Sequence, residues 1–170
     1  MADILIRRAL PADADDLTRI EEAADALLVE LLAPPSWPEV EPGEVRLSMP
    51  GFALIAEVDG DPVGFAHVLE IDDHAHLEQL SVLPSHAGVG IGRALLSAAI
   101  DDARSRGHVL MTLRTFAEVP FNAPFYASAG FVVTEPDTDF LRELVGIETS
   151  LGLTDLGPRV QMSLTLSPGR

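Results

Sequence analysis

Two hydrophobic periodicities divide this 170-residue chain into helices and strands. Apolar residues that recur every three or four positions indicate amphipathic helices, and alternation or short continuous apolar runs indicate strands. The first helix presents one apolar face that includes Leu17, Ile20 and Leu28. The predicted helices are Asp13 to about Leu32, Ile91–Arg106, Asn122–Ala129 and Asp137–Leu151, and a short helix or a turn is predicted near Glu44–Ser48.

The strand pattern predicts a meander of three antiparallel strands in the first half of the chain. Asp59-Gly60 is a hairpin signal between two of these strands, and four prolines with the only tryptophan mark Ala33–Gly43 as a loop. Gly107 and Gly130 are predicted to end the two helices that precede them. The predicted strands are Asp3–Ala9, Phe52–Val58, Pro62–Leu69, Ala75–Leu83, Val109–Thr115, Phe131–Thr134 and Val160–Leu166.

This order of elements predicts an α/β fold, with a mixed and mostly antiparallel sheet flanked by helices. We expect residues 1–170 to form a single domain, because 170 residues with 47% hydrophobic content are enough for one core. The chain has no cysteine, which excludes disulfides, thiolate metal sites and a cysteine nucleophile. His74 and His76 are the only close histidine pair, so no metal site is expected. No apolar run reaches membrane-spanning length, and a cytoplasmic location is the expectation.

Acidic residues are concentrated in the first half of the chain. The formal net charge is −16, with 18 acidic and 4 basic residues in positions 1–80 but 9 and 7 in positions 81–170. Nucleic acid is therefore a poor partner, because its binding requires a basic surface. The division suits an anionic ligand in the second half and a cationic one in the first, although surface acids that only maintain solubility would explain it too.

A glycine loop joins the predicted strand that ends near Leu83 to the helix that begins at Ile91. Its glycines, Gly88, Gly90 and Gly92, allow backbone N–H groups to approach a ligand, and a helix N-terminus adds unpaired donors. The loop therefore predicts an anion site, most naturally for phosphate, unless it is only a tight turn. A P-loop is excluded because the chain has no lysine, and a dinucleotide fingerprint requires wider glycine spacing.

These residues resemble the acyl-CoA pyrophosphate loop of the GCN5-related N-acetyltransferase (GNAT) superfamily, [QR]-x-x-G-x-[GA]. The matching segment is Ala87-Gly-Val-Gly-Ile-Gly92, and Phe125-Tyr-Ala-Ser-Ala-Gly-Phe131 resembles the second motif, F-Y-x-x-x-G-F. Ile6-Arg-Arg-Ala-Leu-Pro-Ala-Asp13 is similar to the first strand and turn of the family. The resemblance implies a sheet whose fourth and fifth strands splay apart to admit acyl-CoA, with acetyl-CoA as co-substrate and no metal.

The resemblance also implies how acetyl-CoA is held. The N–H groups from Gly88 to Arg93 would bind the pyrophosphate, the backbone of Val82 would pair with the pantetheine arm, and the N–H of Leu80 would polarise the thioester. Two positions depart from the family pattern: Ala87 occupies the [QR] position, and Val119 occupies the place of the usual asparagine. Asn122 is then a helix cap first and a pantetheine contact second. The full set of expected cofactor contacts is Leu80, Val82, Ala87, Gly88, Val89, Gly90, Gly92, Arg93 and Asn122.

The proton-transfer groups are expected on the third strand of the meander and in the second motif. Strict alternation would put His76, Glu78 and Leu80 on one face, and residues at the first two positions serve as bases in family members. Glu78 is slightly favoured because a carboxylate also attracts an ammonium group, but a histidine or a bridging water stays open. Tyr126, the only tyrosine, stands where the family has its general acid. Three of these residues also have a purely structural interpretation. His76 would be a solvated turn residue, Glu78 a hydrogen-bonded strand residue and Tyr126 a core aromatic.

The expected function is N-acetyl transfer from acetyl-CoA to a primary amine, by direct attack in a ternary complex. The acidic first half favours a small cationic amine or a protein N-terminus or side-chain amine as acceptor. A non-catalytic acyl-CoA sensor of the same fold is the main alternative, and a purely structural domain is the third. The helix Asp137–Leu151 is an addition to the minimal fold, expected to cover the sheet or a partner subunit, and a homodimer is conceivable.

Overall fold

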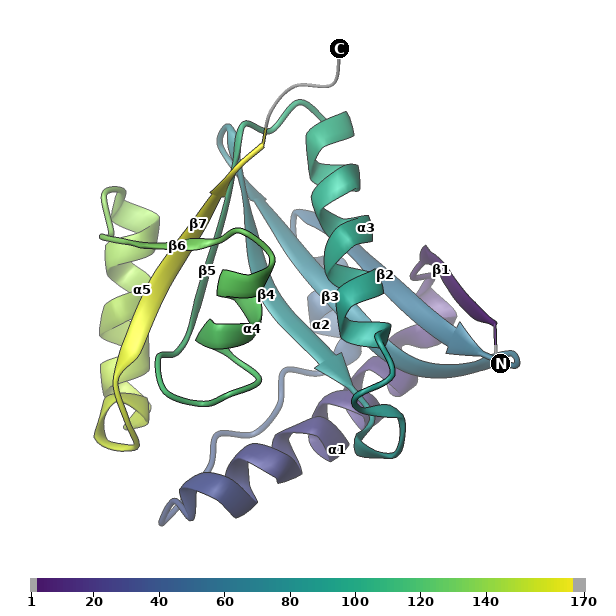
Figure 1. Ribbon diagram of the computed structural model, residues 1–170, viewed down its shortest axis with the longest axis horizontal. Coiled ribbons are helices and arrows are strands. Elements are labelled where there is room, and N and C mark those ends of the chain that lie inside the picture. Colours follow the sequence, from purple (N-terminus) through teal and green to yellow (C-terminus); the bar gives the residue numbers. More distant parts are fainter. Residues whose placement is uncertain (1–2, 167–170) are drawn as a thin grey trace.

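A seven-stranded sheet with the order β1-β2-β3-β4-β5-β7-β6 forms the centre of the computed structural model, which describes residues 3–166 (Figure 1). Strands β4 and β5 are parallel, whereas the pairs β1–β2, β2–β3, β3–β4, β5–β7 and β6–β7 are antiparallel. The predicted mixed, mostly antiparallel sheet is therefore confirmed. The strands are β1 Ile4–Arg8, β2 Gly51–Val58, β3 Asp61–Ile71, β4 His74–Val82, β5 Leu110–Phe116, β6 Val132–Thr134 and β7 Arg159–Thr165.

Five α-helices and three short 3-10 turns connect the strands in the described residues. The predicted helices and strands are confirmed, and their ends differ from the prediction by no more than two residues. The helices are α1 Ala14–Leu32, α2 Gly43–Ser48, α3 Ile91–Ser105, α4 Ala123–Ser128 and α5 Asp139–Ser150, and the 3-10 turns are η1 Pro11–Asp13, η2 Pro84–His86 and η3 Leu153–Asp155.

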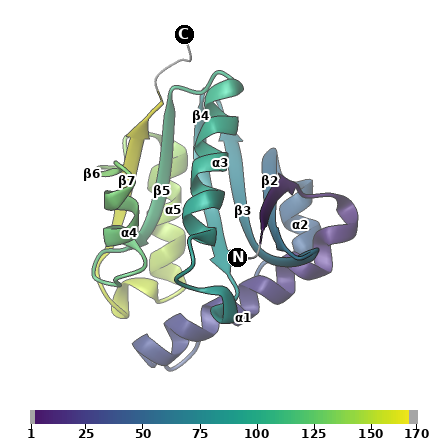
Figure 2. The same cartoon turned by 45° about the vertical axis from the view of Figure 1, so that its right-hand side comes forward.

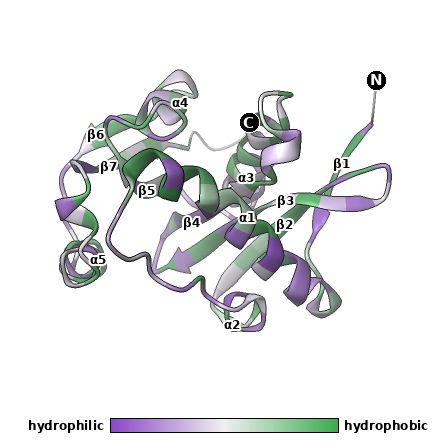
Figure 3. Ribbon diagram, turned by 90° about the horizontal axis from the view of Figure 1, so that it is seen from below, coloured by the Kyte–Doolittle hydropathy of each residue, from purple (hydrophilic) through white to green (hydrophobic). Residues whose placement is uncertain are grey.

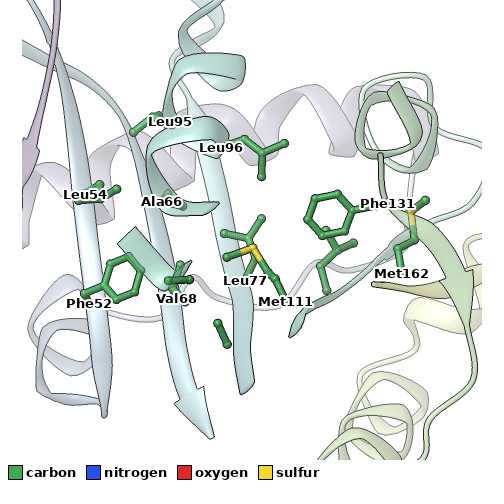
Figure 4. Packing of buried hydrophobic residues seen from close by; sticks show 14 of the residues in the cluster. Phe52, Leu54, Ala66, Val68, Leu77, Leu95, Leu96, Met111, Phe131 and Met162 are labelled. Carbon is green, nitrogen blue, oxygen red and sulfur yellow. The ribbon is translucent and has the colours of Figure 1, made fainter. Parts of the chain in front are cut away.

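The larger part of the core lies between the sheet and helices α3 and α4 (Figure 4). Leu95 and Leu96 of α3 are completely or almost completely buried against the sheet, and burial of one such leucine stabilises a protein by about 2 kcal/mol. Tyr126 of α4 packs at the margin of the same cluster. The labelled members in Figure 4 are Phe52, Leu54, Ala66, Val68, Leu77, Leu95, Leu96, Met111, Phe131 and Met162.

The opposite face of the sheet is covered by α1, α2 and α5. Leu17 and Ile20 of α1 pack on Ile55 and Phe65, which alternate along β2 and β3 with the residues that face α3. Figure 2 shows α3 and α4 in front of the sheet and α2 and α5 behind it. The sheet therefore separates two faces that are covered by different helices.

Two turns in the first half depend on backbone geometry. Asp59 and Gly60 both have positive φ, 52° and 84°, as a two-residue hairpin of type I′ requires, so the Asp59-Gly60 signal is confirmed. Gly43, at the start of α2, is so close to α1 that a Cβ would lie 1.9 Å from the carbonyl oxygen of Ala14. Its N–H donates to Thr18 Oγ1 at 2.9 Å. The proline-rich segment between α1 and α2 is thereby held beside α1.

A bulge in β4 interrupts the predicted alternation. Val68 of β3 is opposite Leu77 and His67 is opposite Gln79, so Glu78 is the extra residue on β4. Before the bulge Leu77 faces α3, and after it Leu80 faces α3, because one extra residue reverses the parity of the strand. The prediction that the side chains of His76, Glu78 and Leu80 share a face is therefore wrong for Leu80.

The same position marks the divergence of β4 and β5. Their parallel register covers only Ala75↔Met111, His76↔Thr112 and Leu77↔Leu113, although β4 continues to Val82 and β5 to Phe116. Beyond Leu77 the two strands part, as the splayed arrangement predicts. Viewed from below, α4, α1 and α5 surround this divergence (Figure 3).

Candidate active site

A cavity of about 1040 Å³ lies where β4 and β5 diverge. It passes through the sheet, since its walls come from both faces. On the α3 side the lining includes the glycine loop and α4, and on the other side α1, the proline-rich segment and α5 contribute. All the predicted catalytic residues line this cavity: His76, Glu78, Leu80 and Tyr126.

The glycine loop opens one end of the cavity toward the N-terminus of α3. Gly88 and Gly90 have φ of 76° and 93°, a region that glycine adopts at little cost, and a Cβ at either position would meet no atom within 4 Å. Their role is therefore conformational rather than steric. Gly90 is the N-cap and has no side chain to satisfy the first N–H groups of the 15-residue helix, so these donors remain available to an anion.

Helix α4 fixes the cationic group nearest to this loop. Arg93 Nη2 donates to Ser128 Oγ at 2.5 Å, and its guanidinium lies 4.8 Å from the centre of the Phe125 ring. Ala87 and Val89 of the loop are both exposed, and neither side chain is charged. Ala87 also lines the cavity. Arg93 thus supplies the positive charge that Ala87 does not provide.

Tyr126 lies between two other aromatic rings at the margin of the core. The ring centres of Phe125 and Phe131 are 5.1 Å and 5.9 Å away, both in tilted, edge-directed arrangements. Burial raises the pKa of the Tyr126 hydroxyl, so the group stays protonated at neutral pH. Within residues 3–166, no hydrogen bond joins this hydroxyl to another protein group, which leaves it free to donate to a ligand.

Asn122 stands at the predicted N-cap of α4, but its side chain makes no capping bond. The capping prediction is wrong because Asn122 Oδ1 accepts a hydrogen bond from Thr115 Oγ1 of β5 at 2.7 Å. This bond orients the amide at the cavity wall. Val119, in place of the family's usual asparagine, is buried and is not among the lining residues.

His76 is buried beneath α5. Only 2% of the residue is exposed, its Nδ1 is 2.8 Å from Thr112 Oγ1, and the Phe140 ring packs edge-on at 5.3 Å. Burial, together with the nearby His74 and Arg114, lowers the pKa of His76 to about 3. The ring is therefore neutral at physiological pH. The reading of His76 as a solvated turn residue is wrong.

Glu78, the bulge residue, reaches the cavity from the same side of the sheet. One carboxylate oxygen lies 3.6 Å from His76 Nε2, and 32% of the side chain is exposed. Burial raises the pKa of Glu78, Arg46 opposes this shift, and the carboxylates of Glu41 and Glu148 add to it. A carboxylate with increased proton affinity at the point of strand divergence is suited to accept a proton.

A buried ion cluster under α5 was not predicted from the sequence. Glu148 accepts from Arg114 Nε at 2.8 Å and from Arg159 Nε and Nη2 at 3.1 Å. Burial by itself would raise the pKa of Glu148, but hydrogen bonds from Arg159 and Arg114 outweigh it and lower the pKa. All three residues line the cavity. The sequence feature that could have indicated this cluster is Glu148, a charged residue within the apolar face of the last predicted helix.

The opposite wall combines α1 and the proline-rich segment. Trp37 Nε1 donates to Asp25 Oδ2 at 3.0 Å, which ties the segment to α1. Glu21 and Arg46 form a buried pair at 2.8 Å, and Arg46 also donates to His67 Nδ1 at 3.1 Å. The further acids Glu39 and Glu41 line the cavity here. This wall is therefore predominantly negative.

Two further features of the described residues bear on function. In residues 3–166, no group of three or more His, Asp or Glu side chains is arranged to hold a metal ion. Across the same part of the chain, no helix has the length and apolar character needed to cross a membrane.

Several proteins with similar sequences or structures are named as acyltransferases or acetyltransferases. The L-amino acid N-acyltransferase MnaT of Escherichia coli is 37% identical over 71 residues, which cover 42% of this chain and 37% of that protein. Among solved structures, the ribosomal-protein-S18-alanine N-acetyltransferase from Escherichia coli has a TM-score of 0.71 at 21% identity, with 99% of this chain and 97% of that chain covered. A putative acetyltransferase from Salmonella typhimurium, yncA, solved with acetyl-CoA, has a TM-score of 0.67 at 23% identity and covers 99% and 96%.

The chain matches less than half of the length of each of these curated relatives. The matched region spans between 37% and 42% of the curated relatives. The description of the acetyltransferase (GNAT) family matches residues 20–131, which include the β4 bulge, the glycine loop and Tyr126. The chain therefore belongs to the GNAT acetyltransferase family.

Proposed function

We propose that this protein transfers the acetyl group of acetyl-CoA to a primary amine, by direct attack in a ternary complex. The observation that carries the proposal is the single cavity that connects the N–H groups at the start of α3 with the Glu78 carboxylate and the Tyr126 hydroxyl. A cavity open to both faces of the sheet lets two substrates meet at the divergence of β4 and β5. The absence of cysteine disfavours an acyl-enzyme route through the usual nucleophile.

Acetyl-CoA would bind from the α3 side. Backbone N–H groups from Ala87 to Arg93, including those of Gly88, Val89, Gly90 and Gly92, would surround the diphosphate, with the charge of Arg93 beside them. The free edge of β4 at Val82 and the Asn122 amide would contact the pantetheine arm. This arrangement relies on backbone donors, which explains how a loop with alanine in the [QR] position retains an anion site.

The chemical step forms one bond and breaks another. The amine nitrogen attacks the thioester carbonyl carbon, a C–N bond forms, and the C–S bond then breaks. The Leu80 N–H would donate to the carbonyl oxygen as it gains negative charge, and one preorganised donor of this kind is typically worth about 3 kcal/mol. Glu78 takes one proton from the ammonium, directly or through one water, which gives the neutral amine that attacks. Tyr126 donates a proton to the leaving thiolate and regains the second proton, which nitrogen loses as the amide forms.

We assign the base to Glu78 rather than to His76. The His76 ring is buried under Phe140, is held by Thr112 and has a pKa of about 3, so it accepts a proton poorly. Glu78 is more exposed and has a raised pKa, which brings its proton affinity closer to neutral pH. His76 then acts as a neutral neighbour that restricts the position of the Glu78 carboxylate.

The acceptor is a primary amine, and two similar proteins suggest the classes to compare. One is named for an alanine of ribosomal protein S18 and the other for L-amino acids. A free amine attracted by the acids Asp25, Glu39, Glu41 and Glu78 fits either class.

Thiol release from acetyl-CoA, followed with a thiol-reactive dye, tests the proposal. The protein adds no background because it has no cysteine. Release that requires an amine, together with an acetylated product of the expected mass, would support a transferase. Acetyl-CoA that raises the melting temperature without release for any amine would favour an acyl-CoA sensor instead.

A further inference from the structure

Glu78 and Arg114 are the next residues of β4 and β5 after the parallel register of these strands ends. The register ends at Leu77↔Leu113, whose side chains both face α3. The next residue of each strand faces the other side, where Glu78 contacts His76 and Arg114 contacts Glu148 of α5. Glu78 and Arg114 both line the cavity that opens where the two strands diverge, so an acid and a base are presented to the same space.

Arg114 retains unused hydrogen-bond donors in the cavity. Its Nε donates to Glu148, whereas within residues 3–166 its two terminal nitrogens make no hydrogen bond with protein. The side chain is only 9% exposed and belongs to the cavity lining. Arg159, by contrast, uses both Nε and Nη2 on Glu148 and stacks on the Phe116 ring at 4.5 Å. Among the described residues, the buried side-chain atoms without a hydrogen-bond partner do not include these nitrogens, so both are accessible from the cavity. A carboxylate matches the geometry of a guanidinium best.

The two walls of the cavity carry opposite charges on this side of the sheet. Arg114 and Arg159 share one carboxylate, Glu148, which leaves one net positive charge beside β5. Across the cavity, Arg46 is paired with Glu21, while Asp25 is bound to an indole N–H and not to a cation. Within the described chain, the further acids of that wall, Glu39 and Glu41, form no salt bridge with an arginine. Such a division suits an acceptor that carries both charges.

We propose that the acceptor is a free α-amino acid whose carboxylate binds Arg114 while its amine faces Glu78. The inference rests on the proposed function and names the substrate class of that same site. In an α-amino acid a single carbon joins the ammonium and carboxylate groups, so a small zwitterion can span the gap between the two strands. Arg114 is then a specificity-determining residue, and Glu148 positions it.

The side chain of this amino acid is apolar. Leu144 and Ile147 of α5, and Leu151 just after it, line the cavity next to the Glu148 cluster, and Ile147 and Leu151 are each 50% exposed. Trp37 and Leu28 line it from the opposite wall. Apolar residues that are accessible inside a substrate cavity favour an aliphatic or aromatic substituent.

A peptide N-terminus and a polyamine are the competing acceptors. A peptide has an amide where the amino acid has its carboxylate, so Arg114 would lose its charged partner. A polyamine would bring a second cation toward Arg114, and two like charges repel each other. Both acceptors are therefore expected to react more slowly than an amino acid of similar size.

Matched acceptors test the inference through thiol release from acetyl-CoA. The panel is L-leucine, L-leucinamide and 3-methylbutylamine, together with L-phenylalanine and its amide. We expect kcat/KM for each amino acid to exceed that for its amide by about tenfold or more, because the amide leaves the buried guanidinium unpaired. In Arg114→Gln, kcat/KM for the amino acid should fall about 10²-fold and that for the amide less than threefold.

Arg159→Gln is the matched control, since it removes the other partner of Glu148 without removing the free donors of Arg114. It should preserve the amino acid to amide ratio even if the protein becomes less stable. Arg114→Lys keeps the charge and should retain part of the preference, which guards against a fold defect in Arg114→Gln. Amides or amines that react as well as amino acids would overturn the inference and leave the transferase intact. Absence of release with every acceptor would overturn both proposals.

Discussion

The two faces of the sheet differ in the groups that they present to the cavity. On the α3 face, the anion site is a contiguous stretch from Ala87 to Arg93, built mainly from backbone N–H groups at a helix start. On the α1 and α5 face, the cavity wall combines side chains from α1, the proline-rich segment, β4, β5 and α5. Backbone donors are available wherever glycines permit the conformation, whereas a side-chain site needs several distant segments to pack correctly.

The difference leads us to expect that the two sites respond differently to substitution. We expect the α3 face to tolerate alanine at the [QR] position, because backbone donors do not depend on side-chain identity. The other face depends on particular charges, such as Glu148 between Arg114 and Arg159. We infer that the first face retains the common co-substrate and that the second selects the acceptor.

We expect the largest effect on turnover from replacement of the Glu78 carboxylate. Glu78→Gln keeps the shape of the side chain but removes the base, so turnover should fall about 10²-fold or more. Because burial raises the pKa of Glu78, wild-type turnover should decrease as pH falls through that pKa, and the variant should lose this dependence. Steady-state rates across pH measure both effects.

Glu143→Gln on the exposed surface of α5 is the control for Glu78→Gln, since it also removes one carboxylate but outside the cavity. Its turnover should match wild type. Full activity of Glu78→Gln would remove Glu78 as the base.

The second prediction concerns the stability of the acceptor face at low pH. Unfolded His76 takes up a proton near pH 6.5, whereas the folded ring, with a pKa of about 3, does not. The unfolded state therefore binds more protons below pH 6.5, and stability is lost as pH falls. Between pH 7.5 and 5.0 wild type should lose about 2 kcal/mol more than His76→Gln, roughly 30-fold in the unfolding equilibrium.

Urea unfolding at both pH values gives this difference directly. Titrating groups that do not shift the His76 pKa, among them Glu21, contribute to both proteins and cancel in the comparison. Equal losses in the two proteins would contradict the burial of a neutral His76.

A smaller effect on turnover is expected from replacement of Tyr126, the proposed proton donor to the leaving thiolate. Tyr126→Phe should lower turnover about tenfold, less than the loss of the base, because a thiolate leaves without full protonation near its pKa of about 8.5. Phe keeps the ring contacts with Phe125 and Phe131, so the melting temperature should change little. A rate equal to wild type would exclude Tyr126 as the general acid.

The smallest expected effect is on acetyl-CoA affinity and comes from a change in the backbone conformation of the glycine loop. Gly90→Ala forces φ of 93° on alanine, at a cost of about 1 kcal/mol, and should weaken acetyl-CoA binding about fivefold. Gly107→Ala at the end of α3 imposes a similar φ, 90°, away from the cavity. Titration calorimetry should find weaker binding in the first variant alone, and equal affinities would argue against the loop as the diphosphate site.

Local pattern was sufficient for the elements and for the α3 face. Helix and strand periodicity, the Asp59-Gly60 turn and the glycine loop depend on residues close together in sequence, and these predictions agree with the structure. The same holds for Tyr126, which lies in a short motif and lines the cavity as expected. Family membership followed from these contiguous segments.

Only the tertiary structure determined the arrangement of the other face. An extra residue at Glu78 reverses the alternation of β4, and strand period cannot reveal it because the bulge exists only relative to β3. Asn122 bonds Thr115 instead of capping its helix, and Glu148 joins Arg114 to Arg159. These contacts connect residues that the sequence separates, and their energies arise only after the sheet and α5 have packed together.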